Sequence, residues 1–180
     1  IDKAHEVLKN TVDNSIMSRS NQKAIEDFTH HSGPVNKQLR SAHKKGVDPS
    51  QTMSRSAHNT VLHMDTIGKK TKPISSSVHV YHGTTRDPRN ELDKEGNWHN
   101  HHFVSTTLDP AHTGYFTGLE HKGQSHIIHF HLPKGSNHGI YADAMSRTHH
   151  ALEGDEHEYI LKRGQKWKHT GSEVVKVGHS

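Results

Sequence analysis

Two glutamates, Glu156 and Glu158, are separated by one residue and are followed at once by the apolar run 159–161. Side chains alternate across a strand, so residues two apart point to the same face. The apolar run indicates that this strand is anchored in a core. Paired carboxylates at the edge of a buried strand are costly and are typical of catalytic sites, although Glu-x-Glu is also common on solvated strand faces.

Two earlier segments also carry polar side chains of catalytic types. Segment 103–107 is typical of a short strand with Phe103, Ser105 and Thr107 on one face. Segment 78–84 is rich in β-branched and aromatic residues and reaches a glycine, which lets a ligand approach the backbone closely. The chain therefore carries His-Gly, Ser-Thr-Thr and Glu-x-Glu on three strands, in that order.

This order resembles the mono-ADP-ribosyltransferases of the bacterial exoenzyme and phage type. The motifs of that family are an arginine on the first strand, a Ser-Thr-Ser strand and Glu-x-Glu. Four further segments are similar to it: two N-terminal helical signatures, a strand with a Pro-x-Gly turn, and the strand and turn after the glutamates. They are residues 24–29, 35–40, 127–136 and 161–168. The resemblance thus covers most of the chain.

The chain departs from the family pattern at two positions. His82 stands where the family has its first-strand arginine, as in the branch that includes diphtheria-like toxins and poly-ADP-ribose polymerases. That branch pairs the histidine with a different second motif, centred on tyrosine. Thr107 stands where the family more often has a second serine. We expect His82 to change the contact with the NAD phosphates and Thr107 to change little.

The resemblance implies that NAD is the substrate and assigns roles to the catalytic residues. Glu158 is expected to bind the ribose 2′-hydroxyl and to face the positive charge of an oxocarbenium-like transition state. Ser105 is expected to hydrogen-bond to Glu158 and fix its rotamer. Glu156 is expected to face the acceptor, because a carboxylate can orient and help to deprotonate a guanidinium.

The same resemblance implies a set of NAD contacts. Gly83 is expected to offer backbone hydrogen bonds to the nicotinamide amide, and Phe116 to stack on the nicotinamide ring unless it is a core aromatic. Arg86 is a candidate phosphate contact, although loop arginines are more often solvated. The full set of expected NAD-binding residues is His82, Gly83, Thr106, Phe116 and Arg86.

The implied activity is NAD-dependent transfer of ADP-ribose to an arginine of a target protein. An NAD glycohydrolase that uses water as acceptor, and a non-catalytic binding module with a decayed site, are the alternatives. A transferase of this kind is a toxin or effector of bacterial or phage type, so we expect secretion or injection and action in a host cytoplasm. Because the sequence begins at Ile1, we expect a processed product or a domain of a longer chain.

Composition limits the other possibilities. The chain has 180 residues, 28% of them hydrophobic, a formal net charge of +4 and no cysteine. A mildly basic surface suits an anionic dinucleotide. The sequence has no basic run interleaved with aromatics and no apolar run of membrane-spanning length, so we expect neither specific nucleic-acid binding nor a membrane partner.

Histidine is unusually frequent, with 22 residues. His129 and His131 share one face of an expected strand, which could bring two metal ligands together. The chain has no His-Glu-x-x-His motif and no cysteine, so we predict surface histidines and no metal.

The pattern along the chain predicts one α+β domain over residues 1–180, with helices over 1–70 packed on a two-sheet β core of the ADP-ribosyltransferase type over 78–180. A helix is expected to end before the breaker residues 32–34, and another to run from Asp48-Pro49 to Gly68 with one apolar face. Segment 86–102 is expected to be a loop with one helical turn, and Asp109-Pro110 to begin a short helix.

Overall fold

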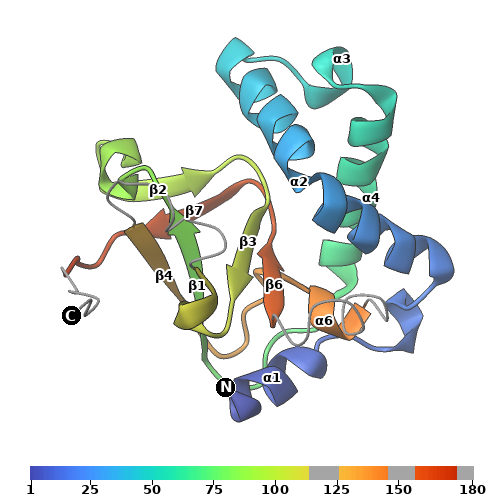
Figure 1. The fold of residues 1–180 in the computed structure, drawn as a ribbon, viewed down its shortest axis with the longest axis vertical. Coiled ribbons are helices and arrows are strands. Elements are labelled where there is room, and N and C mark those ends of the chain that lie inside the picture. Colours follow the sequence, from blue (N-terminus) through green and yellow to red (C-terminus); the bar gives the residue numbers. More distant parts are fainter. Residues whose placement is uncertain (114–125, 146–156, 174–180) are drawn as a thin grey trace.

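The computed structural model describes residues 1–113, 126–145 and 157–173 (Figure 1). The first 70 residues are helical, as the sequence predicts. In Figure 1 the helices α2 and α4 lie side by side and cover one side of the strands, whereas α1 lies near the opposite end of the molecule. The helices are α1 (Asp2–Lys9), the 3-10 helix η1 (Asn14–Ile16), α2 (Arg19–Lys45), α3 (Pro49–Thr52) and α4 (Arg55–Lys70).

The expected break near residues 32–34 is a kink within α2 and not an end. His31 has non-helical angles (φ −126°, ψ 25°), and the helix continues through Pro34 to Lys45. Proline lacks an N–H and its ring collides with the carbonyl of the residue four positions earlier, so the distortion falls before the proline. Packing of Phe28 before the kink and Leu39 after it, both in one hydrophobic cluster, holds the two halves as one element.

The helix expected over residues 48–68 is instead two helices, α3 and α4. Asp48 caps the first through a hydrogen bond from the backbone N–H of Ser50 (2.8 Å). Met53 then has extended angles (φ −81°, ψ 150°), and the Ser54 hydroxyl caps α4 by accepting from the N–H of Ala57 (3.3 Å). The Ser54 cap stops the first helix early, because an N-cap residue must be non-helical.

The strands form two antiparallel sheets. The larger has the order β4-β1-β3-β6-β5, and the smaller pairs β2 with β7. Strand β2 was not expected, because its only large apolar residue is Trp98. The strands are β1 (Val78–Thr84), β2 (Asn97–Asn100), β3 (Val104–Thr107), β4 (His126–Leu132), β5 (Gly139–Tyr141), β6 (Glu158–Leu161) and β7 (Gln165–Lys168). Short 3-10 helices, η2 (Pro88–Glu91) and η3 (Pro110–Thr113), follow β1 and β3, and α6 (Ala142–Met145) follows β5.

A hydrophobic cluster lies on each face of the five-stranded sheet. On one face, Phe103 and Ile160 pack with residues of α2 and α4, and the rings of Phe28 and Phe103 meet edge to face at 5.2 Å. On the other face, Val104 and Tyr159 pack with residues of α1 and of the small sheet. Strands β3 and β6 are therefore fixed from both sides, which is the usual arrangement of a central strand.

The close contact of Gly139 with β6 allows a test of the pairing of β5 with β6. A Cβ at this position would collide with the carbonyl oxygen of Ile160 and lie 2.7 Å from a ring carbon of Tyr159. Because the carbonyl is backbone, it cannot rotate away. We expect Gly139→Ala to lower the free energy of unfolding by about 2 kcal/mol or more, the range of overpacked cores. Gly171→Ala is the control, since nothing lies within 4 Å of its Cβ. Equal chemical-denaturation midpoints for the two variants would contradict this packing.

Candidate active site

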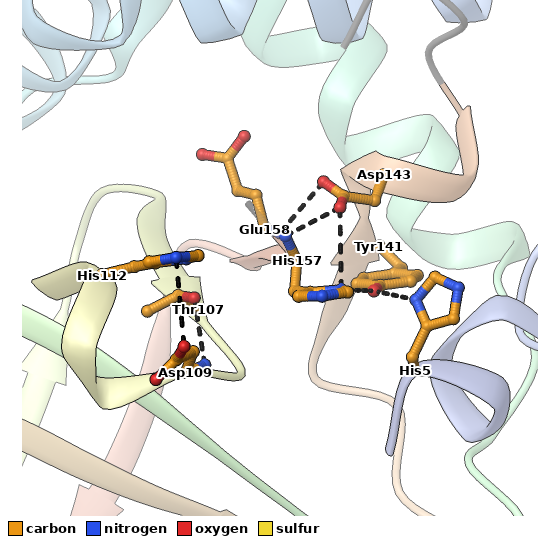
Figure 2. A network of polar contacts seen from close by, with 8 residues as sticks. All are labelled: His5, Thr107, Asp109, His112, Tyr141, Asp143, His157 and Glu158. Carbon is orange, nitrogen blue, oxygen red and sulfur yellow. Dashed lines mark hydrogen bonds and ion pairs between the residues drawn. The ribbon is translucent and has the colours of Figure 1, made fainter. Parts of the chain in front are cut away.

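Glu158 is the first residue of β6 and is only 5% exposed. It pairs with Thr107 on β3. Figure 2 shows its carboxylate extending away from the backbone amide, which is turned toward Asp143. A carboxylate buried at the end of a strand is costly and is a recognised sign of a functional site.

The residue before Glu158 breaks the strand. His157 has a φ of 50°, the left-handed conformation, and β6 begins only at Glu158. Simple alternation along one strand predicts that both glutamates lie on the same face. The assumption of one continuous strand is wrong, because β6 does not include His157. Glu156 itself lies outside the described residues.

The hydroxyl residues of strand β3 lie on both faces of the sheet, and two of them share the face of Glu158. Ser105 pairs with Ile160 and Thr107 with Glu158, so Ser105, Thr107 and Glu158 lie on one face. The expected hydrogen bond from Ser105 to Glu158 stays a prediction. Thr106 is fully buried on the opposite face, and its hydroxyl donates to the carbonyl oxygen of Tyr159 (2.6 Å). The structure thus gives Thr106 a contact that joins β3 to β6, on the face away from Glu158.

His82 on β1 contacts the same stretch of β3. Its Nδ1–H donates to the carbonyl oxygen of Ser105 (2.8 Å), which leaves Nε2 as an acceptor. Burial lowers the pKa of His82, and this hydrogen bond offsets only part of the effect. The imidazole is therefore neutral at pH 7 and supplies a hydrogen bond where an arginine would supply charge. Gly83 is buried next to it, and its expected contact with nicotinamide stays a prediction.

Basic side chains from three segments of the chain lie within electrostatic reach of one another, and one of them, His102, also lies near His82. Burial lowers the pKa of Arg40 on α2, and the neighbouring charge of Arg86 lowers it further. Burial lowers the pKa of His102 to about 4, with further contributions from Arg40, His82, His101 and Arg86. Mutual repulsion of this kind is relieved by a bound anion. We call Arg40, Arg86 and His102 the basic cluster.

Within this cluster, only Arg86 was a predicted phosphate contact. Arg40 lay within a helical signature that was used for the fold, and His102 belonged to one of many histidine pairs. Their proximity depends on how α2 packs against the sheet, where Asn36 bonds to both backbone groups of Phe103 (N–H at 3.1 Å, carbonyl at 3.0 Å). The Nδ1 atom of His102 is buried with no hydrogen-bond partner within the described part of the chain. Phe116, expected to stack on nicotinamide, lies outside the described residues.

The histidines of β1 and β4 come together on the surface of the sheet. His79 lies 2.7 Å from His129 between ring nitrogens, and its ring stacks with His131 at 4.9 Å. Over residues 1–113, 126–145 and 157–173, no group of three side chains is arranged to hold a metal ion. Within the same ranges, no helix is long and apolar enough to cross a membrane.

Comparison with known proteins rests on structure alone, because no family model and no curated protein matches the sequence. An ADP-ribosyltransferase from Clostridium botulinum superposes with a TM-score of 0.63 at 18% identity, covering 92% of this chain and 85% of that one. The ADP-ribosyltransferase Vis from Vibrio splendidus, in complex with agmatine, gives 0.63 at 15% identity, covering 96% and 78%. Exoenzyme S from Pseudomonas aeruginosa, bound to carba-NAD, gives 0.61 at 16% identity, covering 93% and 72%.

The chain has the fold of bacterial ADP-ribosyltransferases. At these identities the superposition establishes the α+β architecture of helices on an antiparallel sheet core, which the sequence motifs predicted. The activity and the roles of single residues need arguments from this chain's own side chains.

The neutral histidines predict a pH dependence of stability. The pKa of His82 and His102 is lower in the folded chain than the ordinary 6.5, so the unfolded chain binds more protons below pH 6.5. Stability should fall as pH drops from 6.5 toward 4, by about 1.4 kcal/mol per unit of pKa difference. Aspartates such as Asp13 have a pKa of about 2 in the folded chain. They change the stability only near and below their ordinary pKa of 3.8.

We expect His102→Gln to flatten this dependence, because glutamine has a similar size and no titration in this range. Urea denaturation at several pH values between 6.5 and 4 measures it. Exposed His169 gives the matched control, His169→Gln. An unchanged slope in His102→Gln would show that His102 is not buried as a neutral base.

Proposed function

We propose that this chain is a mono-ADP-ribosyltransferase that cleaves the nicotinamide–ribose bond of NAD and transfers ADP-ribose to an arginine of a target protein. One observation carries the proposal: buried Glu158 begins β6 opposite Thr107, on the sheet face that Ser105 shares, while His82 bonds to the Ser105 backbone. The three strand motifs therefore meet at one place. The fold shared with bacterial ADP-ribosyltransferases supports the same activity.

Glu158 supplies the main catalytic effect in this proposal. Loss of nicotinamide leaves positive charge on the ribose ring, and a carboxylate fixed in a partly dehydrated site stabilises that charge more than water does. A hydroxyl from Ser105, on the same face, orients the carboxylate. Thr107, which pairs directly with Glu158, is the last residue of β3 at this end of the sheet.

The basic cluster is the proposed site for the diphosphate of NAD. His82 is neutral, so it cannot neutralise phosphate charge as an arginine at this position does. Arg40 and Arg86 approach from α2 and from the segment after β1, close enough that the charge of Arg86 lowers the pKa of Arg40. The diphosphate would relieve their repulsion, and His102 could donate a further hydrogen bond. The arginine missing from β1 is thus replaced from neighbouring elements.

The acceptor assignment rests on Glu156, which the sequence places just before Glu158. The Vis structure holds agmatine, which carries the guanidinium group of arginine. By analogy, the target of this chain is a protein with an exposed arginine, and the protein is a toxin or effector that acts in a host cell. Water in place of the guanidinium would make the chain an NAD glycohydrolase.

Glu158→Gln tests the catalytic assignment. Glutamine keeps the size but loses the charge, so nicotinamide release from NAD should fall on the order of a hundredfold or more, the usual cost of losing one such electrostatic contact. Chromatographic assay of nicotinamide measures the rate, and circular dichroism checks the fold. Exposed Glu95→Gln serves as the control and should retain the wild-type rate. Near-normal turnover in folded Glu158→Gln would overturn the assignment.

Glu156→Gln tests the division of roles between the glutamates. We expect transfer to agmatine to fall at least tenfold while hydrolysis of NAD persists, because one carboxylate serves the acceptor and the other the donor. Both products can be measured in one reaction by mass spectrometry. Equal loss of the two activities would mean that the glutamates act on the same step.

A further inference from the structure

A second buried carboxylate lies next to the backbone of Glu158. Asp143, in the short helix α6, is 1% exposed. One of its oxygens accepts the backbone N–H of His157 (2.7 Å) and the other accepts the N–H of Glu158 (3.1 Å). Burying a carboxylate is costly unless strong hydrogen bonds compensate, and bonds from backbone N–H groups to an ionised acceptor are among the stronger ones.

The left-handed conformation of His157 explains why one carboxylate can take two consecutive amides. In an ordinary strand, successive N–H groups point to opposite edges. A residue with positive φ turns neighbouring N–H groups to one side, which forms an anion-binding concavity of backbone amides. The left-handed conformation is unfavourable for a residue that carries a Cβ. Asp143 offsets that cost, so the two features act as one unit.

Further contacts hold the same turn from the other side. The Tyr141 hydroxyl lies 3.2 Å from Nδ1 of His157 and 2.6 Å from Nδ1 of His5 on α1 (Figure 2). Tyr141 is fully buried, and the rings of His5 and His157 meet edge to face at 5.2 Å. The chain thus connects α1, β5, α6 and the start of β6 through polar side chains, at the residue before Glu158.

We infer that Asp143 is a positioning residue for the proposed reaction: by fixing the amides of His157 and Glu158, it sets the direction in which the Glu158 carboxylate leaves the sheet. This inference rests on the proposed function of Glu158. Asp143 does not contribute to the basic cluster, so its loss should lower kcat for nicotinamide release and leave the KM for NAD nearly unchanged.

The test compares Asp143→Ala and Asp143→Asn with a control that loses partly buried hydrogen bonds elsewhere. Asn137→Ala is suitable, because Asn137 bonds to Thr71 beyond the other end of β5 (2.7 and 2.9 Å). We expect Asp143→Ala to lower kcat at least tenfold with KM within about twofold. Asparagine keeps one carbonyl acceptor and should recover part of kcat. Asn137→Ala should lose stability but keep the wild-type kcat. If Asp143→Ala does not fold, the same kcat and KM comparison on Asp143→Asn decides.

Wild-type kcat in the Asp143 variants, or an equal loss in Asn137→Ala, would overturn the inference. Amide hydrogen exchange gives a readout that does not depend on activity. The amides of His157 and Glu158 should lose protection in Asp143→Asn and keep it in Asn137→Ala, and unchanged protection would also overturn the inference. Absence of nicotinamide release from the wild-type protein, with the exchange result as expected, would instead refute the proposed function.

Discussion

The antiparallel pairing of β3 with β6 is the constraint on which the site depends. It sets Thr107 against Glu158 and Ser105 against Ile160, so the register alone decides which hydroxyls share a face with the carboxylate. A slip of one residue would turn Glu158 toward a different face. Burial prevents that slip, because Ile160 and Tyr159 belong to separate hydrophobic clusters on the two faces. The buried bond from Thr106 to the Tyr159 carbonyl fixes the same register.

Charge is distributed unevenly along these strands. Asp143 in α6 hydrogen-bonds to the backbone at the start of β6, where buried Glu158 lies, whereas Arg40, Arg86 and His102 form the basic cluster, which includes a neighbour of His82. An ADP-ribosyl donor has matching parts: a diphosphate at one position and a ribose that becomes positive at another. His82 hydrogen-bonds to the Ser105 backbone and influences the pKa of His102. Its neutrality is consistent with a role in hydrogen bonding, with the phosphate charge met by the arginines.

The sequence predicted the helical first part and the strand segments from local periodicity, and it predicted the fold from the resemblance of its motifs to a known family. It placed helix boundaries less well: the kink at His31 depends on packing, and the break at Met53 depends on the cap that Ser54 supplies to α4. Strand β2 was missed because its pairing with β7 stabilises a polar segment that has little strand propensity of its own. Arg40 was missed because it reaches the site from a distant part of the chain, and Asp143 was missed because its contacts are with backbone amides, which no sequence motif marks.

The central claim is that this site transfers ADP-ribose from NAD to a guanidinium group. The most direct measurement is mass spectrometry of the wild-type protein incubated with NAD and agmatine, with nicotinamide measured in the same reaction. The proposal predicts ADP-ribosyl-agmatine in step with nicotinamide. Nicotinamide with free ADP-ribose alone would indicate a glycohydrolase, and no nicotinamide with or without agmatine would contradict the account.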